Sequence, residues 1–262
     1  MDLHLRDRVV LVTGGSSGVG LATLRALHGE GALLATCARD THRLAKALAD
    51  AGLPGERVLA RGCDVRDASA VAALLDAVAE RFGRLDGLVN NAGQGRMKRL
   101  AEATGEDWRD ELDLKFASVL HPTRAALPLL RASGQAAVVN INAVLAVQPE
   151  PRLVTTSAAR AGVLNLSRSM AEEFAADGVR VNSVCIGLVD TGQWRRRYEQ
   201  AGTDLDYATW QRGLAADRGI PLARLGTAGE VAAVIAFLLS PQASYVTGCA
   251  VDVAGGINRA IH

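Results

Sequence analysis

The segment VTGGSSGVG, residues 12–20, decides the fold, because an apolar run precedes it and an amphipathic stretch follows it. A strand, a glycine-rich turn and a helix in this order are the context in which such a turn binds phosphate groups. Gly14, Gly18 and Gly20 permit backbone angles closed to other residues and leave no Cβ between the turn and a ligand. A helix that starts near Gly18 points unpaired N–H groups at a pyrophosphate. The turn therefore predicts a dinucleotide site; the alternative is an ordinary strand-to-helix turn.

The composition is that of a globular protein, with 49% hydrophobic and 22% charged residues in a chain of 262. The formal net charge of +1 gives no electrostatic reason to expect nucleic acid or an anionic membrane as a partner. The N-terminal residues lack the pattern of a signal peptide, and no apolar run reaches membrane-spanning length. We therefore expect a cytoplasmic protein with a small-molecule substrate.

The four cysteines each fall in or beside a predicted strand, at positions 37, 63, 185 and 249. No two of them have the spacing of metal ligands, so the sequence predicts no metal site. We expect buried, reduced thiols at all four positions.

Strand-like and helix-like stretches alternate along the whole chain. The predicted strands are 9–12, 33–39, 57–65, 87–93, 136–143, 180–187 and 248–256. The predicted helices are 21–27, 41–51, 67–82, 107–131 with a possible start at Thr104, 154–176 and 228–239. This alternation predicts an α/β fold, a doubly wound parallel sheet with helices on both faces. Without a linker or repeat, residues 1–262 are expected to form a single domain.

In such a sheet the ligand lies beyond the carboxyl ends of the strands, where the strand order reverses. The residues that the sequence places there as cofactor contacts are Gly14, Ser16, Ser17, Gly18, Val19, Gly20, Arg39, Asp64, Val65, Asn91, Ala92, Gly93, Gly187 and Thr191. Asp64 is expected at the adenine amino group, and its alternative role is to cap the following helix. Thr191 is expected at the nicotinamide amide.

The end of the second strand chooses between the two nicotinamide dinucleotides. A carboxylate there binds the ribose hydroxyls, whereas an arginine accommodates a 2′-phosphate. Arg39 comes first and no acid precedes it, so NADP(H) is favoured over NAD(H). In the alternative, Asp40 turns toward the ribose and Arg39 is solvated or stacks on adenine.

Several motifs together resemble the short-chain dehydrogenase/reductase family. They are TGGSSGVG at 13–20, NNAG at 90–93, IPLARLG at 220–226, ASYVTG at 243–248 and a last strand that ends in two glycines at 255–256. The resemblance covers essentially the whole chain. It implies a Rossmann-like fold, an NAD(P)(H)-dependent oxidoreductase acting on an alcohol or carbonyl, and assembly as a dimer or homotetramer.

The resemblance also implies four catalytic positions, occupied in the family by Asn, Ser, and the Tyr and Lys of a YxxxK motif. This chain departs from the family at each of them. LDLK places Asp113 at the Asn position, and NINAVLA places Ala143 at the Ser position. TTSAARAG places Thr156 at the Tyr position and Arg160 at the Lys position, and no YxxxK occurs elsewhere.

These replacements remove the family's proton donor. A threonine hydroxyl does not titrate near neutral pH, and an arginine cannot be deprotonated in a protein. Losing a positioned acid costs roughly 10²–10⁴ in rate, so we expect altered or absent reductase activity with dinucleotide binding retained. We expect Asp113 and Arg160 to form an ion pair, with Arg160 also donating to the nicotinamide ribose. The alternative is that both are unpaired and solvated.

The segment 189–220 resembles the family's substrate lid and carries Trp194, Arg195 and Tyr198 as lid residues. A phenol from Tyr198 or Tyr207 could enter the cleft as a substitute acid when the lid closes. The favoured alternative is an amphipathic helix with Trp194 and Tyr198 packed inward and its arginines solvated.

Three functions remain open, because chemistry belongs to sites and not to folds. The first is an NADP-linked oxidoreductase with a non-standard site. The second is a catalytically inactive NADP(H)-binding protein, a sensor or an oligomer partner. The third is a lyase or isomerase on the same scaffold. Small residues at the start of helix 154–176 permit close helix packing, either between subunits or onto the sheet.

Overall fold

The computed structural model describes residues 2–53, 55–95 and 97–260. Within these ranges, seven strands form one sheet in the order β3-β2-β1-β4-β5-β6-β9, and every pairing between neighbours is parallel. Their bounds are Val9–Thr13 (β1), Leu33–Ala38 (β2), Val58–Gly62 (β3), Gly87–Asn90 (β4), Ala137–Ala143 (β5), Arg180–Ile186 (β6) and Ala250–Val253 (β9). The predicted doubly wound, Rossmann-like α/β fold is confirmed.

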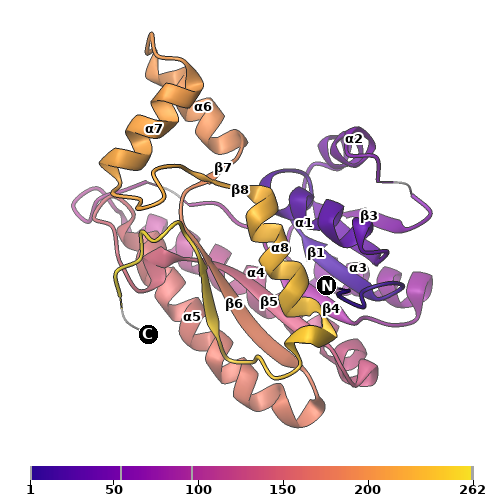
Figure 1. The fold of residues 1–262 in the computed structure, drawn as a ribbon. Coiled ribbons are helices and arrows are strands. Elements are labelled where there is room, and N and C mark those ends of the chain that lie inside the picture. Colours follow the sequence, from indigo (N-terminus) through magenta and orange to yellow (C-terminus); the bar gives the residue numbers. More distant parts are fainter. Residues whose placement is uncertain (1, 54, 96, 261–262) are drawn as a thin grey trace.

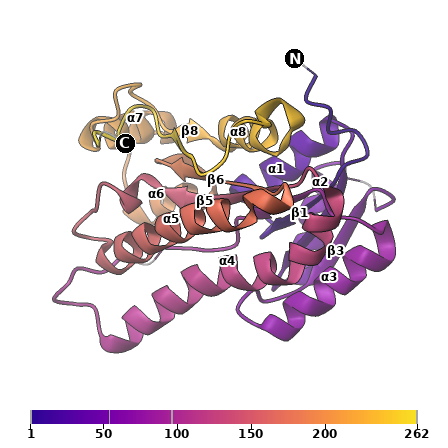
Figure 2. The same cartoon turned by 90° about the horizontal axis from the view of Figure 1, so that it is seen from below.

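The helices cover both faces of this sheet (Figure 2). Their bounds are Gly18–Gly29 (α1), Thr41–Asp50 (α2), Ala68–Phe82 (α3), Gly105–Ser133 (α4), Val154–Phe174 (α5), Gly192–Ala201 (α6), Tyr207–Asp217 (α7) and Ala228–Leu239 (α8). Of the helices described, none is both long enough and apolar enough to span a membrane.

Strand alternation divides the apolar side chains into two cores. Val9 and Leu11 of β1 pack with α3, α4 and α5 on one face, while Val10 and Val12 pack with α1, α2 and α8 on the other. Both faces of β1 are therefore buried, because successive side chains point to opposite sides of a sheet. This is why the strands read as continuous apolar runs rather than as alternating patterns.

Polar side chains fix where most of the helices begin. The carboxylates of Asp40, Asp67 and Asp206 accept hydrogen bonds from N–H groups at the starts of α2, α3 and α7. Thr104 and Thr227 form capping boxes at the starts of α4 and α8, each with the acidic residue three positions on. These caps satisfy N–H groups that otherwise have no partner within the helix. The helix start predicted at Thr104 is confirmed.

The strand order reverses between β1 and β4, the two strands at the centre of the sheet. The chain runs outward from β1 to β3 and then returns to the other side of β1. In sheets of this kind a ligand is expected at the carboxyl ends of the two strands between which the order reverses, and we call this place the crevice. Figure 1 shows α6 and α7 standing at this end of the sheet, above β7 (Val189–Asp190) and β8 (Gly226–Thr227).

Candidate functional site

The glycine-rich turn lies at the carboxyl end of β1 in the shape that its sequence requires. Gly14 and Gly18 have φ angles of +75° and +57°, which side-chain-bearing residues rarely adopt. A Cβ on Gly20 would lie 2.3 Å from the carbonyl oxygen of Gly14, so α1 packs against the turn only with glycine there. A Cβ on Gly18 would lie 3.4 Å from the methyl group of Thr191, which places Thr191 directly opposite the turn.

The N-terminus of α1 has the features of an anion site. No side chain in the described part of the chain caps this helix: Ser17 occupies the N-cap position without a side-chain hydrogen bond. Ser16 is half-buried and Ser17 is exposed, whereas Val19 and Gly20 are buried. The helix dipole and free N–H groups therefore face the bare glycine surface, and these residues fit the pyrophosphate of a dinucleotide.

The NNAG segment holds this turn in place. Thr13 Oγ1 accepts hydrogen bonds from the N–H groups of Asn91 at 3.0 Å and Ala92 at 3.1 Å. The side-chain amide of Asn91 donates to the carbonyl oxygens of Thr13 at 2.8 Å and Gly14 at 3.2 Å. The carboxyl ends of β1 and β4 are thus bound to each other, and Gly93 remains exposed at the crevice.

The end of β2 presents an arginine and not a carboxylate. Asp40 accepts a hydrogen bond from the N–H of Arg43 at 2.9 Å, so its carboxylate is engaged at the start of α2. Arg39 is exposed and makes no hydrogen bond or ion pair with the residues described, although it lies near enough to Asp64 to act on it electrostatically.

Asp64 does not cap the next helix, because Asp67 does so. A hydrogen bond from Arg66 is the largest cause that lowers the pKa of Asp64, and the Arg66 N–H and the positive charge of Arg39 lower it further. The carboxylate of Asp64 is therefore an ionised acceptor beside Arg39. Val65 buries its side chain in the core, and its carbonyl oxygen lies 3.1 Å from Nδ1 of His121.

The expected ion pair between Asp113 and Arg160 is not formed between these described residues, and that expectation is corrected. Asp113 is exposed, and Arg160 Nη1 donates to the carbonyl oxygen of Ile141. The reason is the helical period, because two residues along α4 turn a side chain by about 200°, to the opposite face. Lys115, two residues after Asp113, is buried on the inward face of α4.

A buried ionic cluster, formed by Glu111, Lys115 and Thr156, occupies that inward face. Lys115 Nζ lies 2.9 Å from Glu111 Oε1, and the same oxygen accepts the hydroxyl of Thr156 at 2.7 Å. The side chains of Lys115 and Glu111 are only 3% and 2% exposed. The signals for this pair were its i, i+4 spacing and the scarcity of lysine, which occurs only at positions 46, 98 and 115.

The buried ionic cluster borders the crevice. Lys115 Nζ donates to the carbonyl oxygen of Gln94 at 2.5 Å, in the loop that continues from NNAG. A Cβ on Gly95 would lie 3.6 Å from Thr156 Oγ1, so this loop also passes over Thr156. Ala143 ends β5 nearby and donates its N–H to the side chain of Asn142 at 2.8 Å. Lys115 therefore connects α4 to the loop that follows β4.

Arg160 is held beside these residues without full hydrogen bonding. Its Nε is buried and has no partner among the described residues. Burial lowers the pKa of Arg160, and the negative charge of Glu111 opposes that effect. The carbonyl oxygen of Arg160 accepts the side-chain amide of Asn142 at 3.1 Å, which binds the first turns of α5 to the end of β5.

Residues 14–258 match the family model described as enoyl-(acyl carrier protein) reductase. The chain is 40% identical to cis-4-hydroxycyclohexanecarboxylate dehydrogenase of Sinomonas cyclohexanicum, over 95% of this chain and 96% of that protein. The chain belongs to the short-chain dehydrogenase/reductase family.

Two solved structures of this family are similar along the whole chain. A short-chain oxidoreductase from Pseudomonas aeruginosa PAO1, with NADPH bound and described as containing an atypical catalytic center, is 52% identical with a TM-score of 0.93. The similarity covers 98% of this chain and all of that one. L-sorbose reductase of Gluconobacter frateurii, complexed with NADPH and L-sorbose, is 31% identical with a TM-score of 0.93, and both chains are fully covered.

In this family member, α6 and α7 form a hairpin held by aromatic packing. The rings of Tyr198 and Tyr207 lie 5.1 Å apart, and the guanidinium of Arg195 lies 4.4 Å over the ring of Tyr207. Trp194 packs 6.4 Å from the fourth ring of the cluster, Trp210. Trp194 and Tyr198 are therefore packed between the two helices, as in the favoured alternative, while Arg195 is exposed.

Neither phenol of this hairpin serves the crevice. Tyr198 donates its hydroxyl to the carbonyl oxygen of Leu205 at 2.7 Å, and Tyr207 donates to Asp190 at 2.5 Å. Burial and the hydrogen bond to Asp190 raise the pKa of Tyr207 to about 12. The hypothesis that one of these phenols enters the cleft has no support in this arrangement.

The four cysteine side chains were all expected to be buried. Cys37, Cys63 and Cys185 are buried as expected, but Cys249 is exposed, because it precedes the edge strand β9.

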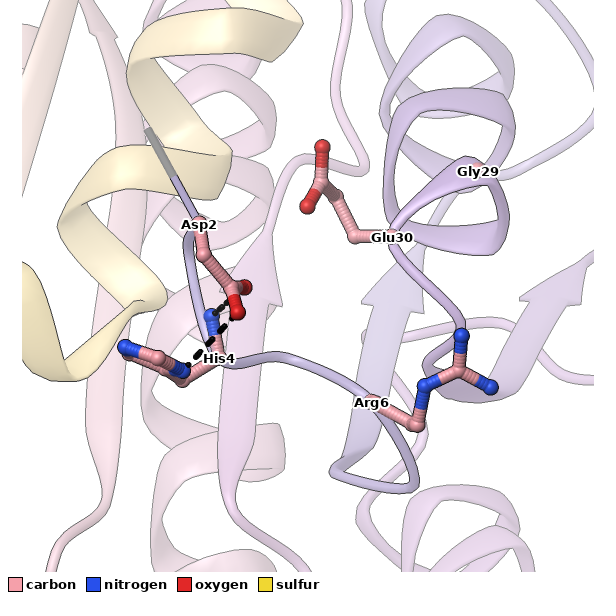
Figure 3. Close-up of a pocket in the computed structure, with 5 residues that line it drawn as sticks. All are labelled: Asp2, His4, Arg6, Gly29 and Glu30. Atoms are coloured by element: carbon pink, nitrogen blue, oxygen red, sulfur yellow. Dashed lines mark hydrogen bonds and ion pairs between the residues drawn. The ribbon is translucent and has the colours of Figure 1, made fainter.

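Figure 3 shows a surface hollow lined by Asp2, His4, Arg6, Gly29 and Glu30. It lies beside the residues that lead into β1, at the amino ends of the strands, and is thus on the wrong edge of the sheet for the ligand.

Proposed function

We propose that this protein is an NADP(H)-dependent oxidoreductase that interconverts an alcohol and a carbonyl compound, with a non-standard active site. The observation that carries the proposal is the glycine surface facing the uncapped start of α1, which matches a pyrophosphate. NADPH in two similar family structures and the dehydrogenase similar in sequence support the choice of cofactor and reaction.

The preference for NADP(H) over NAD(H) rests on the end of β2. Arg39 has no partner among the described residues, whereas Asp40 is engaged at the start of α2. An uncommitted guanidinium binds a 2′-phosphate through charge-assisted hydrogen bonds. A free carboxylate at this place would repel the same phosphate, and Asp40 is not free.

The remaining contacts follow the order of the strands. The turn at 14–20 would bind the pyrophosphate, Asp64 and Val65 the adenine, and 91–93 the side of the cofactor along β4. Arg160 would donate to the nicotinamide ribose, and Gly187 with Thr191 would adjoin the nicotinamide end. When bound, the cofactor supplies or accepts the hydride, and these residues hold and orient it.

Residues 189–220 are proposed to be the substrate lid of a single domain spanning 1–262. The ion pair between Arg218 and Glu150 connects the end of α7 to the loop after β5. Together with the hydrogen bond from Tyr207 to Asp190, this contact attaches the hairpin to the crevice edge, where it would close on a small molecule.

Self-association as a dimer or tetramer is proposed for the α4 and α5 face. Gly162 admits the ring of Phe116, since a Cβ there would lie 2.7 Å from it. Part of the small-residue pattern therefore serves packing within the chain. Ala158 and Ala161 remain exposed and available for contact between subunits. Light scattering behind size-exclusion chromatography measures this state directly.

The test of function combines binding and turnover. Titration with NADPH and NADH, followed by fluorescence, should show tight binding of NADPH and weaker binding of NADH. NADPH absorbance should then fall with at least one member of a carbonyl panel. Binding without turnover on any carbonyl or alcohol would favour the inactive binding protein. Substrate consumption without any change in nicotinamide absorbance would favour a lyase or isomerase.

A further inference from the structure

Burying the charged side chains of Glu111 and Lys115 in the cluster with Thr156 costs free energy of solvation, and packing alone does not explain why charged residues occupy this position. Removing a carboxylate and an ammonium from water costs several kcal/mol per ion, and apolar residues of similar volume fill such space at least as stably. The other two lysines behave differently, since Lys46 is 69% exposed and Lys98 is 37% exposed. Lys115 is thus the one lysine of this chain that is enclosed by the protein.

The position of the cluster connects it to the crevice. Lys115 Nζ contacts the carbonyl oxygen of Gln94, directly after the NNAG segment that binds the glycine-rich turn. Thr156, on α5, reaches Glu111 from the other side. The ammonium therefore lies between the loop after β4 and the first turn of α5, at the edge of the sheet where the ligand is expected.

Lysine has the chemistry that its neighbours lack. The Thr156 hydroxyl does not titrate near neutral pH, and Arg160 does not release its proton in a protein. An ammonium with a shielded environment releases and regains a proton far more readily, which is why lysine serves as a catalytic acid or base.

We propose that Lys115 is the proton donor of this active site, with Glu111 holding its ammonium in place and Thr156 fixing the carboxylate of Glu111. This inference rests on the proposed oxidoreductase function. In the direction of reduction, the carbonyl carbon accepts the hydride of NADPH and the carbonyl oxygen takes a proton from Lys115 Nζ. One N–H bond breaks and one O–H bond forms. The neutral amine left beside Glu111 regains its proton from water.

The charges around Lys115 act on this transfer in opposite directions, because Glu111 stabilises the ammonium and the positive charge of Arg160 opposes that effect. Glu111 faces it from α4, and Arg160 on α5 acts on the same carboxylate, so two cations share one anion. Loss of a proton from Lys115 leaves Arg160 and Glu111 as a neutral pair, which relieves the repulsion between the two cations. Asp113, on the outer face of α4, takes no part in this balance.

The decisive variants are K115R and K115M, with K46M as the matched control on the surface. K115R keeps a cation and its donors but cannot release a proton, and K115M removes both. Each should lower kcat by about 10²-fold or more while changing NADPH affinity only several-fold. K46M should match the wild type in both measurements. Circular dichroism and thermal unfolding confirm that each variant is folded.

The second readout does not depend on turnover. Because the chain has three lysines, ¹³C-lysine labelling gives three sets of NMR signals, and K115R assigns that of Lys115. In E111Q the titration of the Lys115 signal should move to lower pH, since its counter-ion is lost, while those of Lys46 and Lys98 stay in place. T156V should move it in the same direction by less, because the charge remains.

The inference requires that activity follows this titration. The pH profile of kcat in E111Q should move to lower pH together with the Lys115 signal. A moved signal with an unmoved pH profile would show a merely structural ion pair and overturn the inference. A kcat of K115R and K115M that stays within about 3-fold of the wild-type kcat also overturns the inference, because removal of a catalytic acid produces a much larger loss. If the wild type itself oxidises no NADPH at any pH, the proposed function fails first and this inference falls with it.

Discussion

The proposed preference for NADPH over NADH depends on one side chain, that of Arg39. Replacing it with alanine removes the proposed donor to the 2′-phosphate, and hydrogen bonds to charged groups contribute about 1.5–3 kcal/mol. R39A should therefore bind NADPH roughly 10- to 100-fold more weakly. Binding of NADH, which lacks that phosphate, should hardly change. Fluorescence titration with both nucleotides measures the two affinities.

The matched control for this prediction is R25A, which removes an exposed arginine from the middle of α1. Its affinity for both nucleotides should equal that of the wild type. Equal losses for NADPH and NADH in R39A would mean that Arg39 stacks on the adenine, which is the alternative reading of its position.

The turn glycines could be recognised from sequence, whereas the spacing and scarcity that single out Lys115 do not show which way its side chain points. A positive φ and a close backbone approach both demand glycine, so the pattern at 14–20 reports its own geometry. Which face of α4 points at the crevice depends instead on how that helix lies against α5 and the loop after β4. The motif LDLK offered Asp113 and Lys115 two residues apart, and only the packed structure decides between them.

At the scale of elements, the start of α8 depends on one ionised carboxylate. Glu230 accepts the N–H and hydroxyl of Thr227 and pairs with Arg224. The hydrogen bond from Arg224 is the main cause that lowers the pKa of Glu230 from 4.5 to about 2. Since the folded pKa is the lower one, this group contributes stability above pH 4.5, and the contribution is lost as the pH falls toward 2.

The stability of E230Q should accordingly be lower than that of the wild type near neutral pH, and the difference should vanish as the pH falls through that window. Urea unfolding at a series of pH values measures it. E106Q is the control, because Glu106 is also an acidic residue in the first turn of a helix, here α4. A difference for E230Q that persists at the acid end would show that the carboxylate contributes through shape and not through charge.

The elements themselves were largely predictable, and their ends were less so. The predicted strands 57–65, 87–93 and 248–256 shorten to β3, β4 and β9, because their last residues leave the sheet and form the crevice loops. Apolar residues and glycines continue from each strand into the loop that follows it, so the composition does not mark where the hydrogen bonding between strands stops. In 189–220 the resemblance predicted a lid, but the division into α6 and α7 depends on four aromatic rings that meet only in space.

At the scale of the whole molecule, the strand order places the proposed cofactor site at the centre of the sheet. β1, β2 and β4 and the start of α1 all contribute to it, and these elements pack into both cores. A ligand that binds only the folded state should therefore stabilise the entire chain and not one part of it. At 100 times its Kd, NADPH should add about 2.7 kcal/mol to the free energy of unfolding.

That addition corresponds to a rise in Tm of roughly 5–10 °C for a chain of this length. Differential scanning calorimetry should show one transition with and without NADPH, moved as a whole to higher temperature. R39A should reduce the shift, because less of the variant is saturated at the same NADPH concentration. Two transitions, of which NADPH moves only one, would show that the α6–α7 hairpin or the β9 edge unfolds independently, and 1–262 would then not be a single cooperative domain.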